Sequence, residues 1–558
     1  MISRKLVFVT AVTLLAVTAG LYLSGYLTLL LLKLDTGLLK WNTYLGYFHA
    51  LDLPQLAPYV TRIKIGGAIG FGLPAAAWLA LGVLILKPRP KSLHGESRFA
   101  SRGDMARRGL LKPSPDGIVV GKIGNTLIRL PGQQFAILAA PTRSGKGVGI
   151  VVPNLLEYQD SVVVLDIKQE NFDLTSGWRA SQGQEIFLFN PYAEDRRTHR
   201  WNPMSYVSED PAFRISSLQA IAAILYPDGS GQDKFWVSQA RNAFLAFALY
   251  LYEHYDHQRK HKVGRKHLFF PTLGRLFRLS SGDGDNLKAY LQGLSQARFL
   301  SDPAKTAFAG LLSQEKETFA SIMGTLREPL NPWLNPVLDA ATSHNDFVLT
   351  DVRKKKMTIY VGIQPHKLAE SRTLINLFFS QLINVNVQTL PQQDKRLKHQ
   401  CLLLMDEFTA IGKVEIFASA ISFMAGYNLR AMPIIQSMAQ LESVYGKDVA
   451  RTLITNHALQ IMFAPREQQD ANDYSEMLGY TTVRQNNVTR GRDFSRSESH
   501  ERRALMLPQE LKAMGPDKEI FLCEGLAHPV LCDKIKYYQD KYFSSRLQRK
   551  VKVPLLKV

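Results

Sequence analysis

One stretch of the chain combines the residue types that bind the phosphates of a nucleotide. In Gln134–Pro153, an apolar run leads into a loop of small residues that carries Gly145-Lys146, and a second apolar segment follows. This order of strand, loop and helix predicts a Walker A site. Small residues let backbone N–H groups point at the β-phosphate, and the Lys146 ammonium group can reach the β- and γ-phosphates. The residues predicted to bind phosphate are Thr142, Arg143, Ser144, Gly145, Lys146, Gly147 and Val148.

The loop departs from the usual G-x-x-x-x-G-K-[ST] pattern at both ends. Ala140 stands where the first glycine is expected, and Gly147 stands where a hydroxyl would bind Mg²⁺. Taken alone, the loop leaves open a second interpretation, a glycine-rich turn that binds no ligand.

A second motif supplies the acids that nucleotide hydrolysis needs. Cys401–Phe408 is an apolar strand that ends in Asp406-Glu407, the Walker B pattern. Asp406 is predicted to hold Mg²⁺ through its water shell, and Glu407 to polarise the attacking water. The alternative is an acidic helix N-terminus, which is common in α/β proteins. Gln436 ends the next apolar strand and is predicted to sense the γ-phosphate, the alternative being an ordinary polar residue at a strand end.

Apolar β-rich runs recur along the chain and predict the sheet that positions these motifs. Continuous apolar character is what strands buried on both faces need, so we expect a parallel sheet covered by helices. Short alternating segments such as Gly117–Ile123 predict a small additional strand layer before the phosphate loop. The apolar runs are Phe135–Ala139, Val162–Asp166, Ile186–Phe189, Met357–Ile363, Cys401–Asp406, Pro433–Gln436, Leu459–Phe463 and Ile520–Cys523.

A long insertion separates the third and fourth runs, and its apolar residues follow a helical spacing and not the continuous pattern of buried strands. Asp233–Tyr255 has apolar residues at helical spacing, and Pro303–Arg327 also predicts a helix with a proline start. The expected fold class is therefore α/β, with a discontinuous nucleotide-binding domain at 92–193 and 332–540 and an all-alpha domain inserted at 194–331.

Basic residues gather in two places. The run Arg259–Lys266 is interpreted as a solvated loop, with nucleic-acid contact as the alternative. Residues 541–558 form a basic C-terminal tail that we expect to be flexible.

The N-terminal region predicts a membrane anchor. Leu6–Leu32 and Ile65–Leu86 carry no charged residue and are long enough to cross a bilayer, with spans expected at about 6–32 and 65–86 of an anchor that covers 1–91. A pair of buried core helices is the alternative. Because ATP is cytoplasmic, both ends of this hairpin are expected in the cytoplasm.

Composition narrows the choice of class. A chain of 558 residues predicts several domains, and 46% hydrophobic residues exclude a disordered protein. The net charge of +20 suggests a polyanionic partner or an anionic membrane surface. Cys401, Cys523 and Cys532 have no metal-ligand spacing, which indicates a reducing compartment. The absence of an H-E-x-x-H motif removes the simplest membrane-protease interpretation.

The order of the sequence blocks resembles that of the TraG-like coupling proteins of type IV secretion systems, over nearly the whole chain. His94–Phe99 resembles the motif with which the family's cytosolic domain begins. The other blocks are Ala140–Gly149, Val164–Glu170, Asn190-Pro191, Asn202-Pro203, Leu404–Phe408, Gln436–Leu441 and Tyr445-Gly446.

The resemblance implies a bacterial inner-membrane ATPase with a RecA-like P-loop domain, which assembles as a homohexamer and uses ATP and Mg²⁺. Its all-alpha domain would recruit substrate, usually a relaxase bound to single-stranded DNA, for transfer through the type IV secretion channel. Gly147 recurs in the family, which implies that Mg²⁺ depends on Asp406, phosphates and water, with Thr142 or Ser144 as further candidates. An arginine finger from a neighbouring subunit is also implied, and Arg430 is the candidate.

Two rival functions remain open at this point. An FtsK-like pump for double-stranded DNA shares the ring and the anchor, although such pumps usually carry more spans and a terminal winged helix. A docking platform for protein effectors would use ATP only to assemble, but the basic charge disfavours a substrate that is protein alone.

Overall fold

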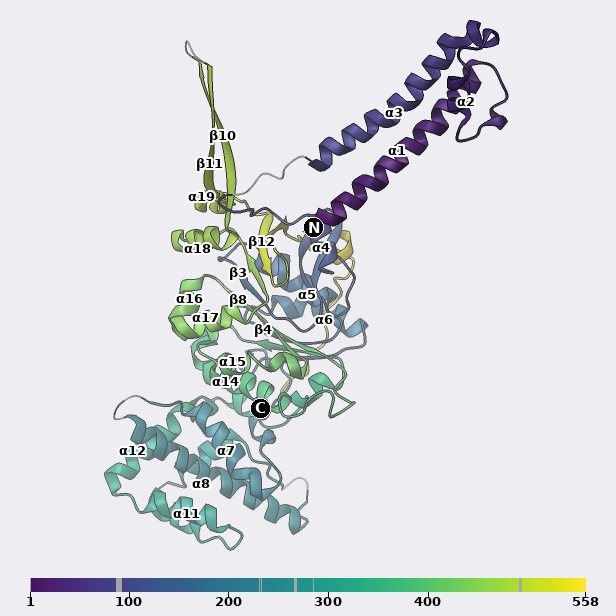
Figure 1. The fold of residues 1–558 in the computed structure, drawn as a ribbon. Helices are drawn as coiled ribbons and strands as arrows, with labels where there is room; N and C mark the ends of the chain where they lie inside the picture. Colours follow the sequence, from purple (N-terminus) through teal and green to yellow (C-terminus); the bar gives the residue numbers. More distant parts are fainter. Residues whose placement is uncertain are drawn as a thin grey trace. The chain divides into compact units, whose positions relative to one another are not determined.

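The computed structural model describes residues 2–86, 93–229, 231, 233–264, 268–284, 286–490 and 494–558. The chain forms two compact units, Met1–Leu93 and His94–Val558 (Figure 1).

The first unit is a helical hairpin. Helices α1 (Ile2–Leu31) and α3 (Val60–Leu86) lie side by side, and the short helix α2 (Thr43–His49) lies in the connection between them (Figure 1). Thr10–Leu31 and Pro54–Val83 are long and apolar enough to cross a membrane by length and composition.

Small residues let the two long helices approach closely. A Cβ atom added to Gly70 would lie 2.3 Å from Ser24 Cα, and one added to Gly66 would lie 2.8 Å from Thr28 Oγ1. Ser24 and Thr28 are fully buried against α3. Gly66 and Gly70 are four residues apart, the small-xxx-small spacing with which apolar helices pack in a bilayer, so the seam closes the hairpin.

Gly70→Leu should open this hairpin, because the new side chain must displace backbone atoms of α1, an overpacking cost of roughly 1–3 kcal/mol. The measurement uses residues 1–93 in detergent micelles, with a donor and an acceptor dye at the two ends of this segment. Förster transfer between the dyes should disappear at a lower SDS fraction in the variant than in the parent segment. Gly72→Leu is the matched control, because a Cβ atom at Gly72 meets nothing within 4 Å. Equal SDS sensitivity of the two variants would contradict the packing assigned to Gly70.

The second unit is built on an 11-stranded sheet of order β2-β1-β13-β12-β9-β3-β8-β7-β4-β6-β5. Strands β3 to β9 are parallel to their neighbours within this group, as the apolar runs predict. They are β3 (Ala136–Ala139), β4 (Ser161–Asp166), β5 (Glu185–Phe189), β6 (Met357–Gly362), β7 (Cys401–Met405), β8 (Leu429–Ile435) and β9 (Leu459–Met462).

The expectation of a wholly parallel sheet is wrong at one end. Strand β12 (Lys518–Cys523) pairs antiparallel with β9, and β13 (Val530–Asp533) pairs antiparallel with β12. The small strand layer expected before the phosphate loop is present as β1 (Ile118–Ile123) and β2 (Thr126–Leu130), which extend the same sheet beyond β13. Apolar character reports burial, and it does not report strand direction.

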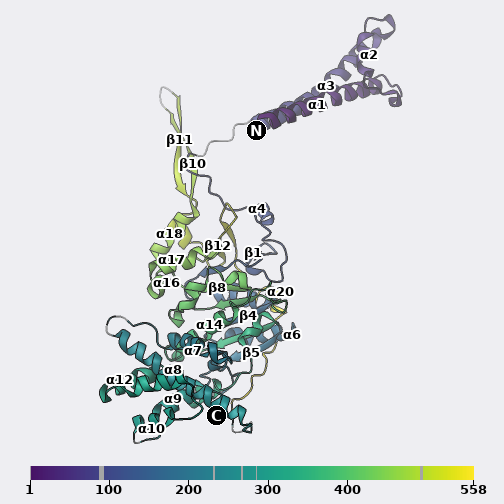
Figure 2. The same ribbon diagram turned by 60° about the horizontal axis from the view of Figure 1, so that its bottom comes forward.

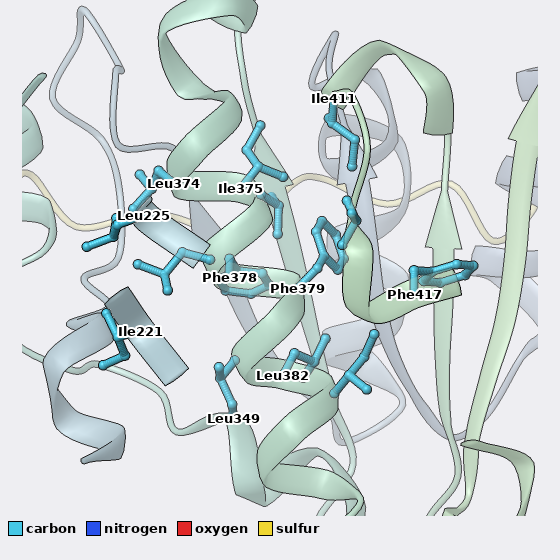
Figure 3. Close-up of a cluster of buried hydrophobic side chains, with 14 of the residues drawn as sticks. Ile221, Leu225, Leu349, Leu374, Ile375, Phe378, Phe379, Leu382, Ile411 and Phe417 are labelled. Atoms are coloured by element: carbon cyan, nitrogen blue, oxygen red, sulfur yellow. The ribbon is translucent and has the colours of Figure 1, made fainter. Parts of the chain in front are cut away.

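Both faces of the sheet are buried. Along β4, Val163 and Leu165 belong to one apolar core, whereas Val162 and Val164 belong to the core on the opposite face. Helix α14 (Leu368–Asn386) covers the first face, and Figure 3 shows its side chains between those of Ile221 and Leu225 on one side and those of Ile411 and Phe417 on the other. The sheet and the inserted helices therefore share one core.

The insertion between β5 and β6 is helical, as predicted (Figure 2). The predicted helix 233–255 is present as α8, whereas the predicted single helix Pro303–Arg327 is two helices that end and begin around Ser313–Glu315. Both pack against α8. The helices are α7 (Pro211–Leu225), α8 (Asp233–Lys260), α9 (Leu273–Ser281), α10 (Leu287–Ser295), α11 (Asp302–Leu312), α12 (Lys316–Arg327) and α13 (Pro336–Ala341).

The basic run Arg259–Lys266 begins at the end of α8, where the Arg259 guanidinium lies 5.7 Å from the centre of the Tyr255 ring. Arg265 and Lys266 lie outside the described residues.

The expectation of a flexible C-terminal tail is wrong. Arg546 Nη1 donates a hydrogen bond to Leu156 O at 2.9 Å, and Lys550 Nζ donates one to Asp173 Oδ1 at 2.9 Å. Further along, the backbone N–H of Leu556 donates to Arg196 O at 2.8 Å. Basic side chains that suggest a solvated tail are thus used to bind the tail to the sheet domain.

A second feature was not predicted. Strands β10 (Tyr480–Arg490) and β11 (Phe494–Ala504) pair with each other in a long hairpin outside the main sheet (Figure 1). Its sequence is mostly polar on both faces, which leaves no hydrophobic pattern to detect.

Candidate nucleotide-binding site

The strand order brings the predicted motifs to one edge of the sheet. The phosphate loop follows β3, the two acids follow β7, and β8, which ends just before Gln436, lies between these strands. Because β3, β7 and β8 are parallel, their carboxyl ends meet, which is where ligands bind in open α/β sheets.

The phosphate loop has the backbone geometry of a tight turn. Arg143 has a φ of 58° and Gly145 a φ of 86°, the second a conformation that glycine adopts without strain. The chain then enters a π-helical turn, Gly147–Val151, which continues into α5 (Val152–Glu157). The predicted helix after the loop is therefore present, and its first turn is wider than an α-helical turn.

A short chain of polar contacts joins three of the predicted residues. Lys146 Nζ donates a hydrogen bond to Glu407 Oε1 at 2.5 Å, and Gln436 Nε2 donates one to Glu407 Oε2 at 2.7 Å. Lys146 Nζ also lies 3.2 Å from Asp406 Oδ1. Hydrogen bonds and ion pairs thus join the cation of the phosphate loop, both acids and the glutamine in one cluster.

The two acids differ in their environment. Burial works to raise the pKa of Glu407, but the hydrogen bonds from Lys146 and Gln436 outweigh it, so the pKa lies below its ordinary value. Burial raises the pKa of Asp406 in spite of the nearby Lys146 charge. Glu407 also has a φ of 59°, a strained conformation for a residue other than glycine, and such strain gathers at functional sites.

Asp406 has the features of a cation ligand. Its Oδ1 atom is buried and accepts no well-aligned hydrogen bond from the described residues, although Lys146 lies close by. Ser144 Oγ, in the phosphate loop, is buried and unpartnered in the same sense. The described residues contain no group of three or more His, Cys, Asp or Glu side chains placed so that they alone could hold a metal ion. One carboxylate completed by phosphates and water is the usual set for Mg²⁺, so these residues fit that ion.

The segment after β4 adds residues that had no predicted role. Asp166 accepts a hydrogen bond from the backbone N–H of Phe172 at 2.8 Å, and burial raises the pKa of Asp166 to about 7. The charge of the exposed Lys168 acts to lower the pKa of both Asp406 and Glu407. Their position at the carboxyl end of a buried strand was the available signal.

Arg430 is not where an arginine finger could act. Its side chain is fully buried on β8, and burial lowers the pKa of its guanidinium. It donates hydrogen bonds to the backbone oxygens of Gln134 at 2.6 Å, Asp116 at 2.6 Å and Leu130 at 2.9 Å. The assignment of Arg430 as a finger is therefore corrected: it joins β8 to the end of β2 and to the segments that precede β1 and β3.

Strand order, phosphate loop and acidic strand end define a RecA-like P-loop domain with an inserted all-alpha region. The family model described as "Type IV secretory system Conjugative DNA transfer" matches residues 91–555, and the chain belongs to that family, the coupling proteins of type IV secretion.

Relatives and solved structures agree with this assignment. The chain is 30% identical over 498 residues to protein VirD4 of Rhizobium radiobacter, which covers 86% of this chain and 70% of that protein. It is 27% identical over 557 residues to conjugal transfer protein TraG of Escherichia coli, covering 88% and 84%. The plasmid coupling protein TrwB in complex with ADP and Mg²⁺ has a similar fold, with a TM-score of 0.56 and 17% identity over 80% of this chain and 96% of that chain.

Arg430→Ala should act on stability, because it removes a fully buried side chain that donates to three backbone carbonyls. We expect the free energy of unfolding to fall by about 3 kcal/mol. Thermal unfolding of the full chain measures this loss, and ATP turnover per folded molecule should stay near the parent value. A variant of unchanged stability that lost turnover would restore the finger assignment.

Proposed function

We propose that the chain is an inner-membrane ATPase that assembles as a homohexamer and drives relaxase-bound single-stranded DNA through a type IV secretion channel. The observation that carries the ATPase part of this proposal is the contact chain Lys146–Glu407–Gln436 at the carboxyl ends of neighbouring strands. Membership of the conjugative DNA transfer family supports DNA as the cargo.

Each residue of the cluster has one proposed task. The Thr142–Val148 loop binds phosphate through its backbone, and Lys146 neutralises the β- and γ-phosphates. Glu407 orients the attacking water and accepts a proton from it. Because the pKa of Glu407 is lowered, its carboxylate is charged and acts as a weak base. Gln436 contacts Glu407 and so couples the state of the γ-phosphate to β8.

Asp406 would hold Mg²⁺, with Ser144 as a further candidate, and the bound ion would supply charge neutralisation on the phosphates. The complexes of TrwB with ADP and Mg²⁺ and with an ATP analogue support nucleotide and Mg²⁺ binding here.

The proposed domain division follows from these tasks. Residues 1–91 form the anchor, 92–193 and 332–540 the ATPase domain, 194–331 the substrate-recruiting domain, and 541–558 a basic tail. The two apolar helices and the site's need for ATP support a two-span anchor with the catalytic domain in the cytoplasm.

Glu407→Gln should abolish ATP turnover while leaving ATP binding nearly intact, because the amide keeps the shape of the side chain but cannot accept the proton of the attacking water. We expect kcat to fall by at least about a hundredfold. Phosphate release by the detergent-solubilised full chain measures turnover, and a fluorescent ATP analogue measures affinity. Lys146→Ala should instead lose both properties. Parent-rate hydrolysis by either variant would refute the assigned role.

Binding of single-stranded DNA should weaken steeply with salt, because each neutralised phosphate releases counterions. Between about 50 mM and about 200 mM salt we expect at least about a hundredfold loss of affinity, with little base preference. Reversing Arg259, Lys260 and Lys262 to Glu should change this slope only slightly, since the helical domain is assigned to recruitment of substrate. Affinity that does not vary with salt would favour the protein-effector platform instead.

A further inference from the structure

A buried lysine, Lys534, contacts the backbone of the phosphate loop. Lys534 directly follows β13, and its Nζ atom donates a hydrogen bond to Ser144 O at 3.3 Å. The same Nζ atom lies 3.5 Å from the centre of the Phe463 ring, at the end of the strand next to β3. Only 8% of Lys534 is exposed. A lysine is almost never this buried unless its ammonium group has specific partners.

The chain around Lys534 also contacts the turn that follows the loop. A Cβ atom added to Gly149 would lie 3.4 Å from Ile535 O and 3.9 Å from Lys534 Cβ. Gly149 therefore packs against this segment with little room to spare. The segment thus contacts the phosphate loop both before and after Lys146.

An acid is buried beside the lysine. Glu519 on β12 is fully buried, and its Oε1 atom is 3.7 Å from the Cys532 thiol, which donates to it. Its Oε2 atom has no hydrogen-bond partner among the described residues. A Cβ atom on Gly121 would lie 2.2 Å from Glu519 Oε1, so glycine makes room for the carboxyl group.

Burial shifts the pKa of both groups toward the neutral form. Burial raises the pKa of Glu519 well above its ordinary value, and the Lys534 charge opposes that change. Burial lowers the pKa of Lys534 to about 8, and Glu519 opposes it. Buried ionisable groups cost stability, so retaining both in the sheet calls for a role other than packing.

The contact with Ser144 sets the direction of a phosphate-binding group. In a planar trans peptide the C=O and N–H bonds point in opposite directions. A Ser144 carbonyl held toward Lys534 therefore turns the N–H of Gly145 away from Lys534, so that this N–H stays free to meet the phosphate of the proposed site.

We propose that Lys534 is a positioning residue of the nucleotide site, which orients the Ser144–Gly145 peptide for phosphate binding. This inference rests on the proposed function. It assigns a catalytic support role to the antiparallel strands β12 and β13, which the nucleotide motifs themselves do not include.

The test is a steady-state comparison of Lys534→Met with the detergent-solubilised full chain. A misdirected N–H weakens ground state and transition state alike, so the KM for ATP should rise about tenfold while kcat changes by less than about twofold. Lys534→Arg, which keeps the charge and a donor, should recover most of the affinity.

The matched control is Lys536→Met, since Lys536 lies on the same segment but pairs with Asp517 on the surface, its Nζ 2.7 Å from Asp517 Oδ1. It should keep the parent KM. If Lys534→Met does not fold, Lys534→Gln provides the second measurement. That variant keeps a polar donor, but its side chain is too short to reach the Ser144 carbonyl, and its KM should rise severalfold.

Unchanged KM in folded Lys534→Met, an equal rise in Lys536→Met, or unchanged KM in folded Lys534→Gln would overturn the inference. Lys146→Ala separates this failure from a failure of the proposed function. If Lys146→Ala loses turnover and Lys534→Met keeps the parent KM, only the inference fails. If Lys146→Ala still turns over ATP, the nucleotide site itself is misassigned.

Discussion

The ammonium group of Lys146 lies within reach of both Walker B acids, and the rest of the fold serves to bring these charges together. Asp406 and Glu407 are adjacent in the chain but stand far from Lys146 in sequence. Only a parallel sheet that places β3, β8 and β7 in this order aligns their carboxyl ends. The charges can be partly buried because each has a partner, which offsets the cost of removing it from water.

The antiparallel strands extend this function beyond the motifs. The parallel strands bring loops to the edge of the sheet, whereas β12 and β13 return the chain to the back of the phosphate loop, where Lys534 meets Ser144. The phosphate loop therefore has contacts with both the parallel and the antiparallel part of the sheet. The parallel strands carry the side chains assigned to phosphate binding. In our proposal, the antiparallel strands orient the Ser144–Gly145 peptide of the phosphate loop.

Part of the positive charge of the chain is structural. Arg179, Arg353 and Arg430 are buried, and each donates hydrogen bonds to backbone carbonyls of segments distant in sequence. Arg546 and Lys550 bind the C-terminal segment to the sheet domain. The net charge of +20 therefore overstates the charge that is free to meet a polyanion. Arginine suits such positions because its fork of donors can satisfy several carbonyls at once.

The sequence by itself predicted the parallel part of the sheet and the motif residues that the fold brings together at its edge. The glycine-rich loop, the acidic strand end and the glutamine after the next strand each follow a buried apolar run, and such runs are local patterns. The helical insertion was equally visible, because helical spacing is also local. Two candidate membrane helices followed from length and composition alone.

Tertiary structure alone decided what depends on contacts between distant segments. An apolar pattern does not indicate strand direction. The antiparallel pairing of β12, β13, β1 and β2 could therefore not be predicted from the sequence. The charge of a side chain does not indicate which group it will contact. Arg430 was therefore predicted to be an arginine finger, and the basic C-terminal tail was predicted to be flexible. Lys534 follows no motif, and its role depends on a carbonyl in the phosphate loop that only the folded chain brings within 3.3 Å.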